Sequence, residues 1–296
     1  MNIVEKIGSS LVEISAEKPA KQTVASEPKQ FDLDLRLLKR QGLYHPDAVS
    51  TQLALEMRAV KRRLLRRIGF LRATGERNAF RKPGKQKNII LVTSTRAGEG
   101  KTFSAANLAL SFAIEDQIET LLIDCDVARP KVRRYLGLPE SPGVTDLIAD
   151  TSLDPLSVAW KVNDWPMSVI SEGAPIERAT ELYGSENAQS LWTRLSRENA
   201  NRLVIIDSPP VLAATEAVVL AKFVDEIVFV VEANSTPEPA VAASIDELLD
   251  VNPNVSLMLN RCLIASGGSH YGSYEYYNRG ARDGRSGTSK GDNDDD

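Results

Sequence analysis

Residues 88–102 of the chain read Asn88-Ile-Ile-Leu-Val-Thr-Ser-Thr-Arg-Ala-Gly-Glu-Gly-Lys-Thr102. This stretch begins with an apolar run of strand length, continues into a turn with two glycines, and leads directly into a helical pattern. Such glycines let backbone N–H groups turn toward a polyphosphate, and the N-terminus of the helix adds partial positive charge. The stretch predicts a phosphate-binding loop between a strand and a helix. Thr95 stands where the usual motif has its first glycine, and a chance turn is the alternative for this stretch alone.

Two further apolar runs end in carboxylates. Leu121-Leu-Ile-Asp-Cys-Asp126 carries Asp124 and Asp126, and Leu203-Val-Ile-Ile-Asp207 carries Asp207. Because parallel strands end at one edge of a sheet, we expect these groups to converge on Lys101 and Thr102. The set predicts a nucleotide site in which Lys101 reaches phosphates and Thr102 and Asp207 hold Mg²⁺. Spacing leaves open which of Asp124 and Asp126 assists the metal and which accepts a proton.

From residue 88 onward, short apolar runs alternate with helical patterns, which predicts an α/β fold. Apolar runs without alternation suit strands covered on both faces, hence a mostly parallel, P-loop NTPase-like sheet flanked by helices on both faces. The expected helices begin near Gly100, Ala179, Thr215 and Thr236. The expected strands are Asn88–Thr93, Thr120–Asp124, Ser168–Ser171, Leu203–Asp207, Glu226–Glu232 and Val255–Asn260.

Four segments follow from this pattern. We expect an N-terminal amphipathic helix (residues 1–14) and linker over 1–50, and a basic helix with its linker over 51–87. The core then covers 88–265, and a disordered tail covers 266–296. Basic residues dominate between Leu55 and Lys87, where a solvated helix face and a subunit or membrane-surface contact are both open interpretations.

Composition narrows the function classes. The 296 residues include 36 Lys and Arg against 40 Asp and Glu, so the net charge of −4 favours no nucleic-acid partner. Two cysteines and two histidines are too few for a disulfide framework or a zinc site. The sequence shows no export signal and no apolar run of bilayer length, which predicts a cytoplasmic protein.

A tyrosine cluster stands out near the C-terminus. Four of the seven tyrosines, Tyr271, Tyr274, Tyr276 and Tyr277, fall within seven residues of a Gly-, Ser- and Asn-rich segment. Composition alone favours a low-complexity end or a weak aromatic contact site.

Together with Leu121–Pro130, Asp207-Ser-Pro-Pro210 and the phosphate-binding loop, this cluster resembles the bacterial tyrosine kinases of capsule and exopolysaccharide assembly. The closest resemblance is to the soluble cytoplasmic branch that accompanies exosortase loci. It implies ATP and Mg²⁺ as cofactors and phosphorylation of the tail tyrosines in trans, which would regulate polymer assembly. The residues implied in ATP binding are Arg96, Ala97, Gly98, Glu99, Gly100, Lys101, Thr102 and Phe103.

The resemblance also assigns the catalytic roles. It places Thr102, Asp126 and Asp207 around Mg²⁺ and makes Asp124 the base for the tyrosine hydroxyl. The implied catalytic set is Lys101, Asp124, Asp126 and Asp207, and the implied phosphoacceptors are Tyr271, Tyr274, Tyr276 and Tyr277.

The implied partners are further copies of the chain in a ring or dimer, a membrane co-polymerase that activates the kinase, and a protein-tyrosine phosphatase. The chain would then sit at the inner membrane through its partner. Leu55, Arg58 and Lys61 stand at the three positions of the family's Glu-x-x-Arg-x-x-Arg subunit contact, so the motif's glutamate is missing, which counts against that ring contact. In the second motif, Ala128 replaces a usual arginine. Asn260, by the same resemblance, is a candidate for adenine contact or a plain turn residue.

Two other functions remain open on the sequence. A partitioning or division-site ATPase switch would dimerise on ATP without phosphorylating protein, and Arg96 could mimic the signature lysine of that class. A regulatory module could bind nucleotide and transfer nothing, which would account for Thr95, Leu55 and Ala128. Asp207-Ser-Pro-Pro210 and the tyrosine cluster favour the kinase over the ATPase switch. The intact Lys101, Thr102, Asp124, Asp126 and Asp207 favour it over the regulatory module.

Overall fold

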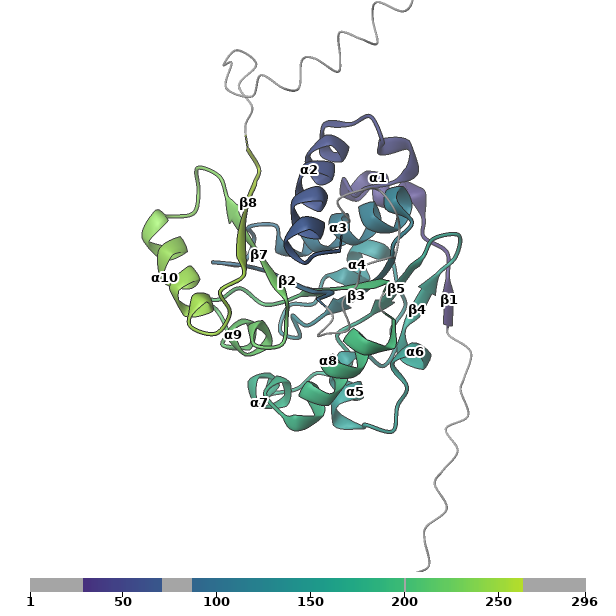
Figure 1. The fold of residues 1–296 in the computed structure, drawn as a ribbon. Helices are drawn as coiled ribbons and strands as arrows, with labels where there is room; N and C mark the ends of the chain where they lie inside the picture. The colour runs from purple at the N-terminus through teal and green to yellow at the C-terminus, as the bar shows by residue number, and fades with distance from the viewer. Residues whose placement is uncertain (1–28, 71–86, 200, 263–296) are drawn as a thin grey trace, which may run out of the picture. The chain divides into compact units, whose positions relative to one another are not determined.

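The computed structural model describes residues 29–70, 87–199 and 201–262. The part up to Asn260 is built on an eight-stranded sheet in the order β1-β4-β5-β3-β6-β2-β7-β8 (Figure 1). Neighbouring strands are parallel except for β4 and β5. The strands are β1 Lys29–Phe31, β2 Ile89–Ser94, β3 Glu119–Asp124, β4 Trp160–Val162, β5 Met167–Ile170, β6 Arg202–Asp207, β7 Glu226–Glu232 and β8 Val255–Asn260.

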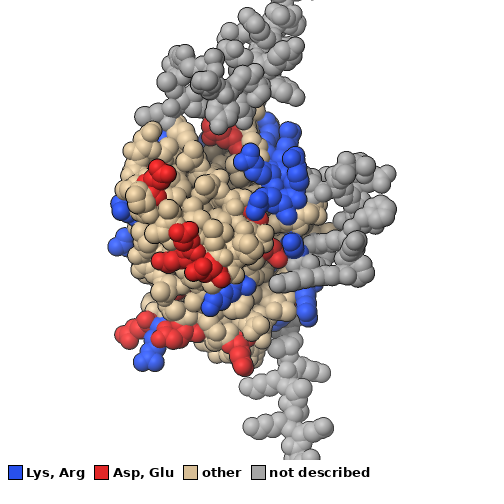
Figure 2. Space-filling view, turned by 60° about the vertical axis from the view of Figure 1, so that its left-hand side comes forward, with Lys and Arg blue, Asp and Glu red and all other residues tan. Residues whose placement is uncertain are grey.

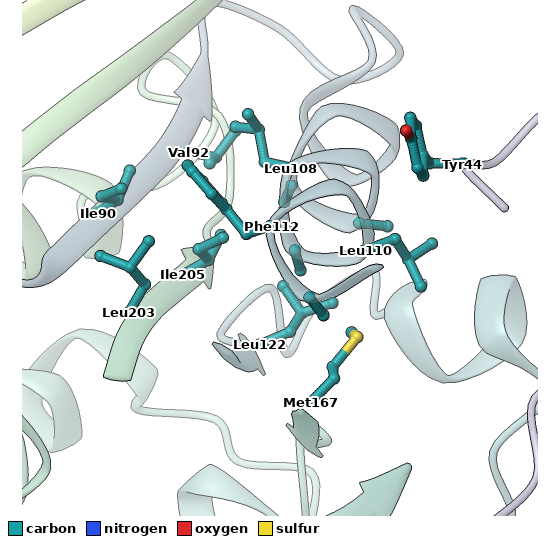
Figure 3. Close-up of a cluster of buried hydrophobic side chains, with 14 of the residues drawn as sticks. Tyr44, Ile90, Val92, Leu108, Leu110, Phe112, Leu122, Met167, Leu203 and Ile205 are labelled. Carbon is teal, nitrogen blue, oxygen red and sulfur yellow. The ribbon is translucent and has the colours of Figure 1, made fainter. Parts of the chain in front are cut away.

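The central strands are buried on both faces. Along β2, Ile90 and Val92 enter one hydrophobic core, and Ile89 and Leu91 enter the other. This alternation explains the unbroken apolar runs in the sequence, because a residue pointing to either face meets helices rather than water. Figure 3 shows the first core, where Phe112 lies among side chains from several strands.

Helices cover both faces of the sheet, as predicted (Figure 1). The first face carries α1 Leu35–Gln41, α2 Gln52–Arg67, α3 Lys101–Asp116 and α4 Val132–Leu136. The second carries α5 Val144–Ala149, α6 Pro155–Val158, α7 Ala179–Tyr183, α8 Glu186–Glu198, α9 Glu216–Ala221 and α10 Glu238–Leu249. A short 3₁₀ turn, η2 Pro46–Ala48, precedes α2.

Residues 29–50 differ from the predicted linker. They contain β1, which pairs with β4, and α1, whose Leu38 is fully buried. Tyr44 is also fully buried, and its backbone N–H donates to Asn107 Oδ1 of α3 at 2.6 Å. Few apolar anchors lie among many charges here, so the periodicity is weak although the segment packs on the core.

The predicted helix after residue 51 is α2, which packs on α3. The amine of Lys61, a residue only 2% exposed, contacts Glu115 Oε2 at 2.7 Å and Asp116 Oδ2 at 2.6 Å. Arg58 also pairs with Glu115. The two cations that align with the family's subunit-contact motif are therefore both bound to α3 of their own chain.

Other arginines of α2 face solvent. Arg62, Arg63, Arg66 and Arg67 are exposed, although Arg67 Nε also pairs with the buried Glu226 of β7 at 2.6 Å. Figure 2 shows basic side chains gathered on one side of the described surface. The remaining basic residues between 71 and 86, the predicted helix over 1–14 and the tyrosine cluster lie outside the described residues. Within the ranges that the structure describes, no helix has the length and apolar composition needed to cross a bilayer.

Candidate nucleotide site

Three neighbouring strands deliver the predicted residues to one edge of the sheet. In the register of the sheet, Asp207 at the end of β6 lies opposite Asp124 at the end of β3 and Val92 near the end of β2. The loop that follows β2 leads into α3 over the same edge. The parallel order β3-β6-β2 therefore brings the two carboxylate strands and the phosphate-binding loop together, as the sequence predicts.

The backbone of the loop has the shape that an anion site requires. Gly98 and Gly100 have φ values of +97° and +101°, which favour glycine. Gly100 is the N-cap of α3 and supplies no side-chain cap, so the first amides of the helix have neither a capping side chain nor an intrahelical acceptor. Open amides at a helix N-terminus fit a polyphosphate.

Lys101 lies between two carboxylates. Its side chain is 7% exposed, and its amine is 2.5 Å from Asp126 Oδ2 and 3.9 Å from Asp207 Oδ1. Burial alone would lower the pKa of Lys101, but the charges of Asp207 and Asp126 outweigh it and raise the pKa above its ordinary value. Lys101 is therefore a fixed positive charge at the start of α3.

Asp207 is a buried carboxylate with spare acceptor capacity. Neither of its oxygens has a hydrogen-bond partner, although the side chain is fully buried. Burial raises the pKa of Asp207 to about 6, and the charge of Lys101 opposes this rise. Unpartnered buried carboxylate oxygens suit a hard cation, so the residues present fit Mg²⁺.

Three side chains could serve as ligands for such a cation. Thr102, 4% exposed, follows Lys101, and Asp126 and Asp207 supply carboxylates nearby. Within the described ranges, no group of three or more His, Cys, Asp or Glu side chains is arranged to hold a metal. Proteins commonly bind Mg²⁺ through one or two carboxylates together with substrate phosphates and water, and Asp126 and Asp207 are two such carboxylates.

Asp124 and Asp126 differ in their surroundings. Asp124 is fully buried and accepts the backbone N–H groups of Asp126, Lys131 and Val132, each at 3.0 Å. Burial and the charge of Asp207 raise its pKa well above the usual value. Asp126 instead faces Lys101, and its Oδ1 accepts the N–H of Arg129 at 3.2 Å. Oδ2 of Asp124 accepts two of these bonds and Oδ1 accepts one, so Oδ1 keeps acceptor capacity for a further proton donor.

The segment after Asp207 locks β6 to the phosphate-binding loop. Thr93 Oγ1 donates to the carbonyl of Pro209 at 2.8 Å, and the N–H of Val211 donates to the carbonyl of Ser94 at 2.8 Å. Ser208 Oγ donates to the carbonyl of Val92 at 3.1 Å. The Asp-Ser-Pro-Pro motif thus holds the end of β6 against the end of β2. From the sequence, this motif could be used only as evidence of resemblance to a family, and its structural role could not be predicted.

The remaining predicted residues are placed as follows. Arg96 is exposed, whereas Phe103 is half-buried against the first core, so Phe103 reaches the site through its backbone alone. Asn260 ends β8, and its side-chain amide donates to the carbonyl of Glu99 at 2.8 Å. Cys125 is fully buried. The four predicted phosphoacceptors lie outside the described residues.

Sequence reasoning missed Thr236, whose hydroxyl donates to Glu99 Oε1 at 2.7 Å. Thr236 precedes α10 and is 137 residues from Glu99 in the chain. Its position before Pro237 reads only as a helix start, so the sequence held no signal for this contact.

Comparison with known proteins gives a consistent set of relatives. The solved kinase domain of VpsO is 30% identical, with a TM-score of 0.56, and the match covers 60% of this chain and 87% of that domain. The tyrosine-protein kinase YwqD of Bacillus subtilis (strain 168) is 28% identical over 198 residues, which are 67% of this chain and 81% of YwqD. The kinase domain of the Escherichia coli tyrosine kinase ETK has a TM-score of 0.63 at 21% identity, over 83% of this chain and 92% of that domain, a likeness of fold alone. No family model matches the chain.

Proposed function

Because the chain belongs to the bacterial tyrosine kinase family, we propose that it is an autokinase that transfers the γ-phosphoryl group of ATP to tyrosines of its own C-terminal segment. The acceptors are Tyr271, Tyr274, Tyr276 and Tyr277, and the transfer runs in trans between copies of the chain.

The observation that carries the proposal is the convergence at the start of α3. Lys101 is held within ion-pair distance of Asp126 and Asp207, and the unpartnered oxygens of Asp207 face this group. Phosphoryl transfer needs positioning and charge neutralisation more than covalent chemistry. A helix N-terminus, one buried lysine and a pair of carboxylates are the groups that such a reaction uses.

Each group then has a defined task. The amides from Ala97 to Phe103 and the Lys101 amine bind the ATP phosphates. Thr102, Asp126 and Asp207 hold Mg²⁺, which when bound neutralises charge on the phosphates. Asp124 takes the proton of the tyrosine hydroxyl, a step that its raised pKa supports and its three backbone hydrogen bonds restrain.

The direct test uses the full chain with Mg²⁺ and γ-labelled ATP, alone and with the cytoplasmic part of its membrane partner. Wild type is expected to acquire phosphotyrosine, and Lys101→Met is expected to lose it, because the substitution removes the buried charge that binds phosphate. Lys161→Met is the matched control, since Lys161 is an exposed lysine of β4. Equal labelling of Lys101→Met and wild type would contradict the proposal.

The same assay separates the other functions. ATP hydrolysis without phosphotyrosine would favour the ATPase switch. Nucleotide binding with neither hydrolysis nor labelling would favour a regulatory module.

We further propose that the kinase works as an oligomer beside a membrane co-polymerase of polysaccharide assembly, with a phosphatase reversing the reaction. Each phosphate adds about −1.5 to −2 charge. Phosphorylated tails on neighbouring copies would repel one another and loosen the assembly, which supplies a means of regulating polymer assembly.

A further inference from the structure

The tip of the phosphate-binding loop contains a buried glutamate that the proposed reaction does not use. Glu99 is only 3% exposed, although it stands in the loop between two glycines. Its Oε2 accepts the backbone N–H of Arg96 at 3.0 Å, and its Oε1 accepts the hydroxyl of Thr236 at 2.7 Å. Both oxygens of the buried carboxylate are therefore satisfied, one within the loop and one from outside it.

A carboxylate at this position needs an explanation. Burial of a charged group is costly, and a negative charge beside a polyphosphate site opposes the ligand. The backbone conformation of the loop does not require a carboxylate at position 99, because a residue with a small side chain could form the same turn. The two hydrogen bonds that Glu99 accepts are what distinguish it from such a residue.

The first bond closes the loop on itself. With the Arg96 N–H donated to Glu99, residues 96–99 form a hydrogen-bonded turn before any ligand arrives. The amide of Arg96 is thereby turned away from phosphate, and the anion site is confined to the amides that follow it. A loop that is already folded loses less conformational entropy when it binds.

The second and third bonds connect the loop to other strand ends. Thr236 lies between β7 and α10, and Asn260 ends β8. The Asn260 side-chain amide donates to the Glu99 carbonyl at 2.8 Å. Gly100 permits this approach, because a Cβ there would lie 2.0 Å from Asn260 Nδ2. The loop after β2 is thus held from the carboxyl ends of β7 and β8.

We propose that Glu99, Thr236 and Asn260 form a brace that holds the phosphate-binding loop in its binding shape without nucleotide. Glu99 acts as a positioning residue through its side chain, and Thr236 and Asn260 anchor it to the β7–α10 connection and to β8. The brace rests on the proposed nucleotide site, but it concerns binding and loop order rather than phosphate transfer.

The test measures equilibrium binding of a fluorescent ADP analogue with Mg²⁺ to the full chain. Glu99→Ala removes both side-chain bonds and is expected to weaken binding about tenfold. Glu99→Gln keeps an acceptor oxygen and is expected to recover most of the affinity. Thr236→Val is expected to weaken binding by about threefold to tenfold, and Thr236→Ser is expected to restore it.

A double-mutant cycle tests whether the two residues act as one unit. If Glu99 and Thr236 act through their shared bond, Thr236→Val adds little once Glu99 is alanine. The matched control is Thr145→Val, which removes a buried threonine hydroxyl whose partners are the carbonyls of Glu172 and Ala174. This control is expected to leave ADP binding unchanged.

Two readouts separate positioning from a loss of stability. Hydrogen exchange of the Arg96 amide in the nucleotide-free chain is expected to rise in Glu99→Ala, while exchange in the central strands stays slow. In the kinase assay, Glu99→Ala is expected to raise KM for ATP with kcat largely kept. The brace is wrong if Glu99→Ala binds the ADP analogue within about twofold of wild type, or if Thr145→Val weakens binding equally. A chain that binds ADP and shows these variant effects but makes no phosphotyrosine would overturn the proposed function and leave the brace standing.

Discussion

Asp207, the carboxylate that we propose as a Mg²⁺ ligand, lowers the stability of the nucleotide-free chain. Its side chain is fully buried, and its oxygens accept no hydrogen bond of ordinary geometry. The Lys101 amine, 3.9 Å away, and the Thr102 hydroxyl favour the charged form of this carboxylate. Its pKa is about 6 in the folded chain, against an ordinary value of 3.8. The folded state therefore holds the Asp207 proton more tightly than the unfolded state, and the stability linked to this proton is lost as the pH rises from about 4 to about 6.

We predict that Asp207→Asn stabilises the nucleotide-free chain at pH 7.5 by about 1–3 kcal/mol, because it removes a buried charge while Lys101 keeps Asp126 as its partner. Urea unfolding at pH 7.5 and at pH 5 measures the effect, and the gain is expected to be smaller at pH 5. The same variant is expected to lose kinase activity. A variant less stable than wild type at pH 7.5 would show that Asp207 is well solvated by groups other than those seen here.

Gly100 offers a second prediction at this scale. Its φ of +101° disfavours any other residue, and Asn260 occupies the place that a Cβ would take. Gly100→Ala is expected to abolish nucleotide binding while the sheet remains folded, as measured by ADP titration and circular dichroism. Gly69→Ala is the control, because Gly69 also has a positive φ but no atom within 4 Å of its Cβ position. Equal loss of binding in both variants would count against a specific contact.

The helix α2 is held on the core by ion pairs with α3. Lys61 is almost fully buried and binds Glu115, Asp116 and the carbonyl of Ser111. Removing the Lys61 amine leaves the carbonyl of Ser111 and the carboxylate of Asp116 without this donor, whereas Glu115 keeps its pair with Arg58. The basic residues of α2 therefore fall into two groups. Arg58 and Lys61 form ion pairs with α3, whereas Arg62 and its exposed neighbours lie on the surface.

We predict that Lys61→Met lowers the free energy of unfolding by about 1–3 kcal/mol. Arg62→Met, the exposed neighbour on the same helix, is expected to change stability by less than about 0.5 kcal/mol. Thermal or urea unfolding of the two variants side by side decides the matter. Similar losses would mean that the contact with α3 does not hold α2 in place.

The elements also show what sequence patterns can and cannot predict. The six longer strands were predictable within a residue or two, because each is a short, mostly apolar segment between turn signals, although Ser168 interrupts β5 and Ser256 interrupts β8. β1 and β4 have three residues each, too few for periodicity to register, and their pairing joins segments more than a hundred residues apart. For a similar reason, the packing of residues 29–50 could not be predicted. It depends on a few buried residues, such as Leu38 and Tyr44, which are too few to give a periodic pattern.

At the scale of the whole molecule, the parallel order of the sheet creates the site. The strands β3, β6 and β2 are neighbours and end at the same edge of the sheet. Residues from motifs that are far apart in the sequence therefore lie close together there. Lys101, Asp126 and Asp207 could be predicted for this reason. The side-chain environments could not, because the three backbone donors to Asp124 and the Thr236 bond to Glu99 depend on loop conformations that no spacing encodes.

The central claim is that one copy of the chain phosphorylates the tail of another. The most direct measurement mixes two full-length forms with Mg²⁺ and ATP. A Lys101→Met chain serves as the acceptor, and a chain with Tyr271, Tyr274, Tyr276 and Tyr277 all changed to Phe serves as the kinase. Mass spectrometry is then expected to find phosphate on one or more of the four tyrosines of the Lys101→Met chain. Transfer in trans is contradicted if the acceptor tail stays without phosphate while wild-type chain, assayed separately under the same conditions, acquires phosphotyrosine.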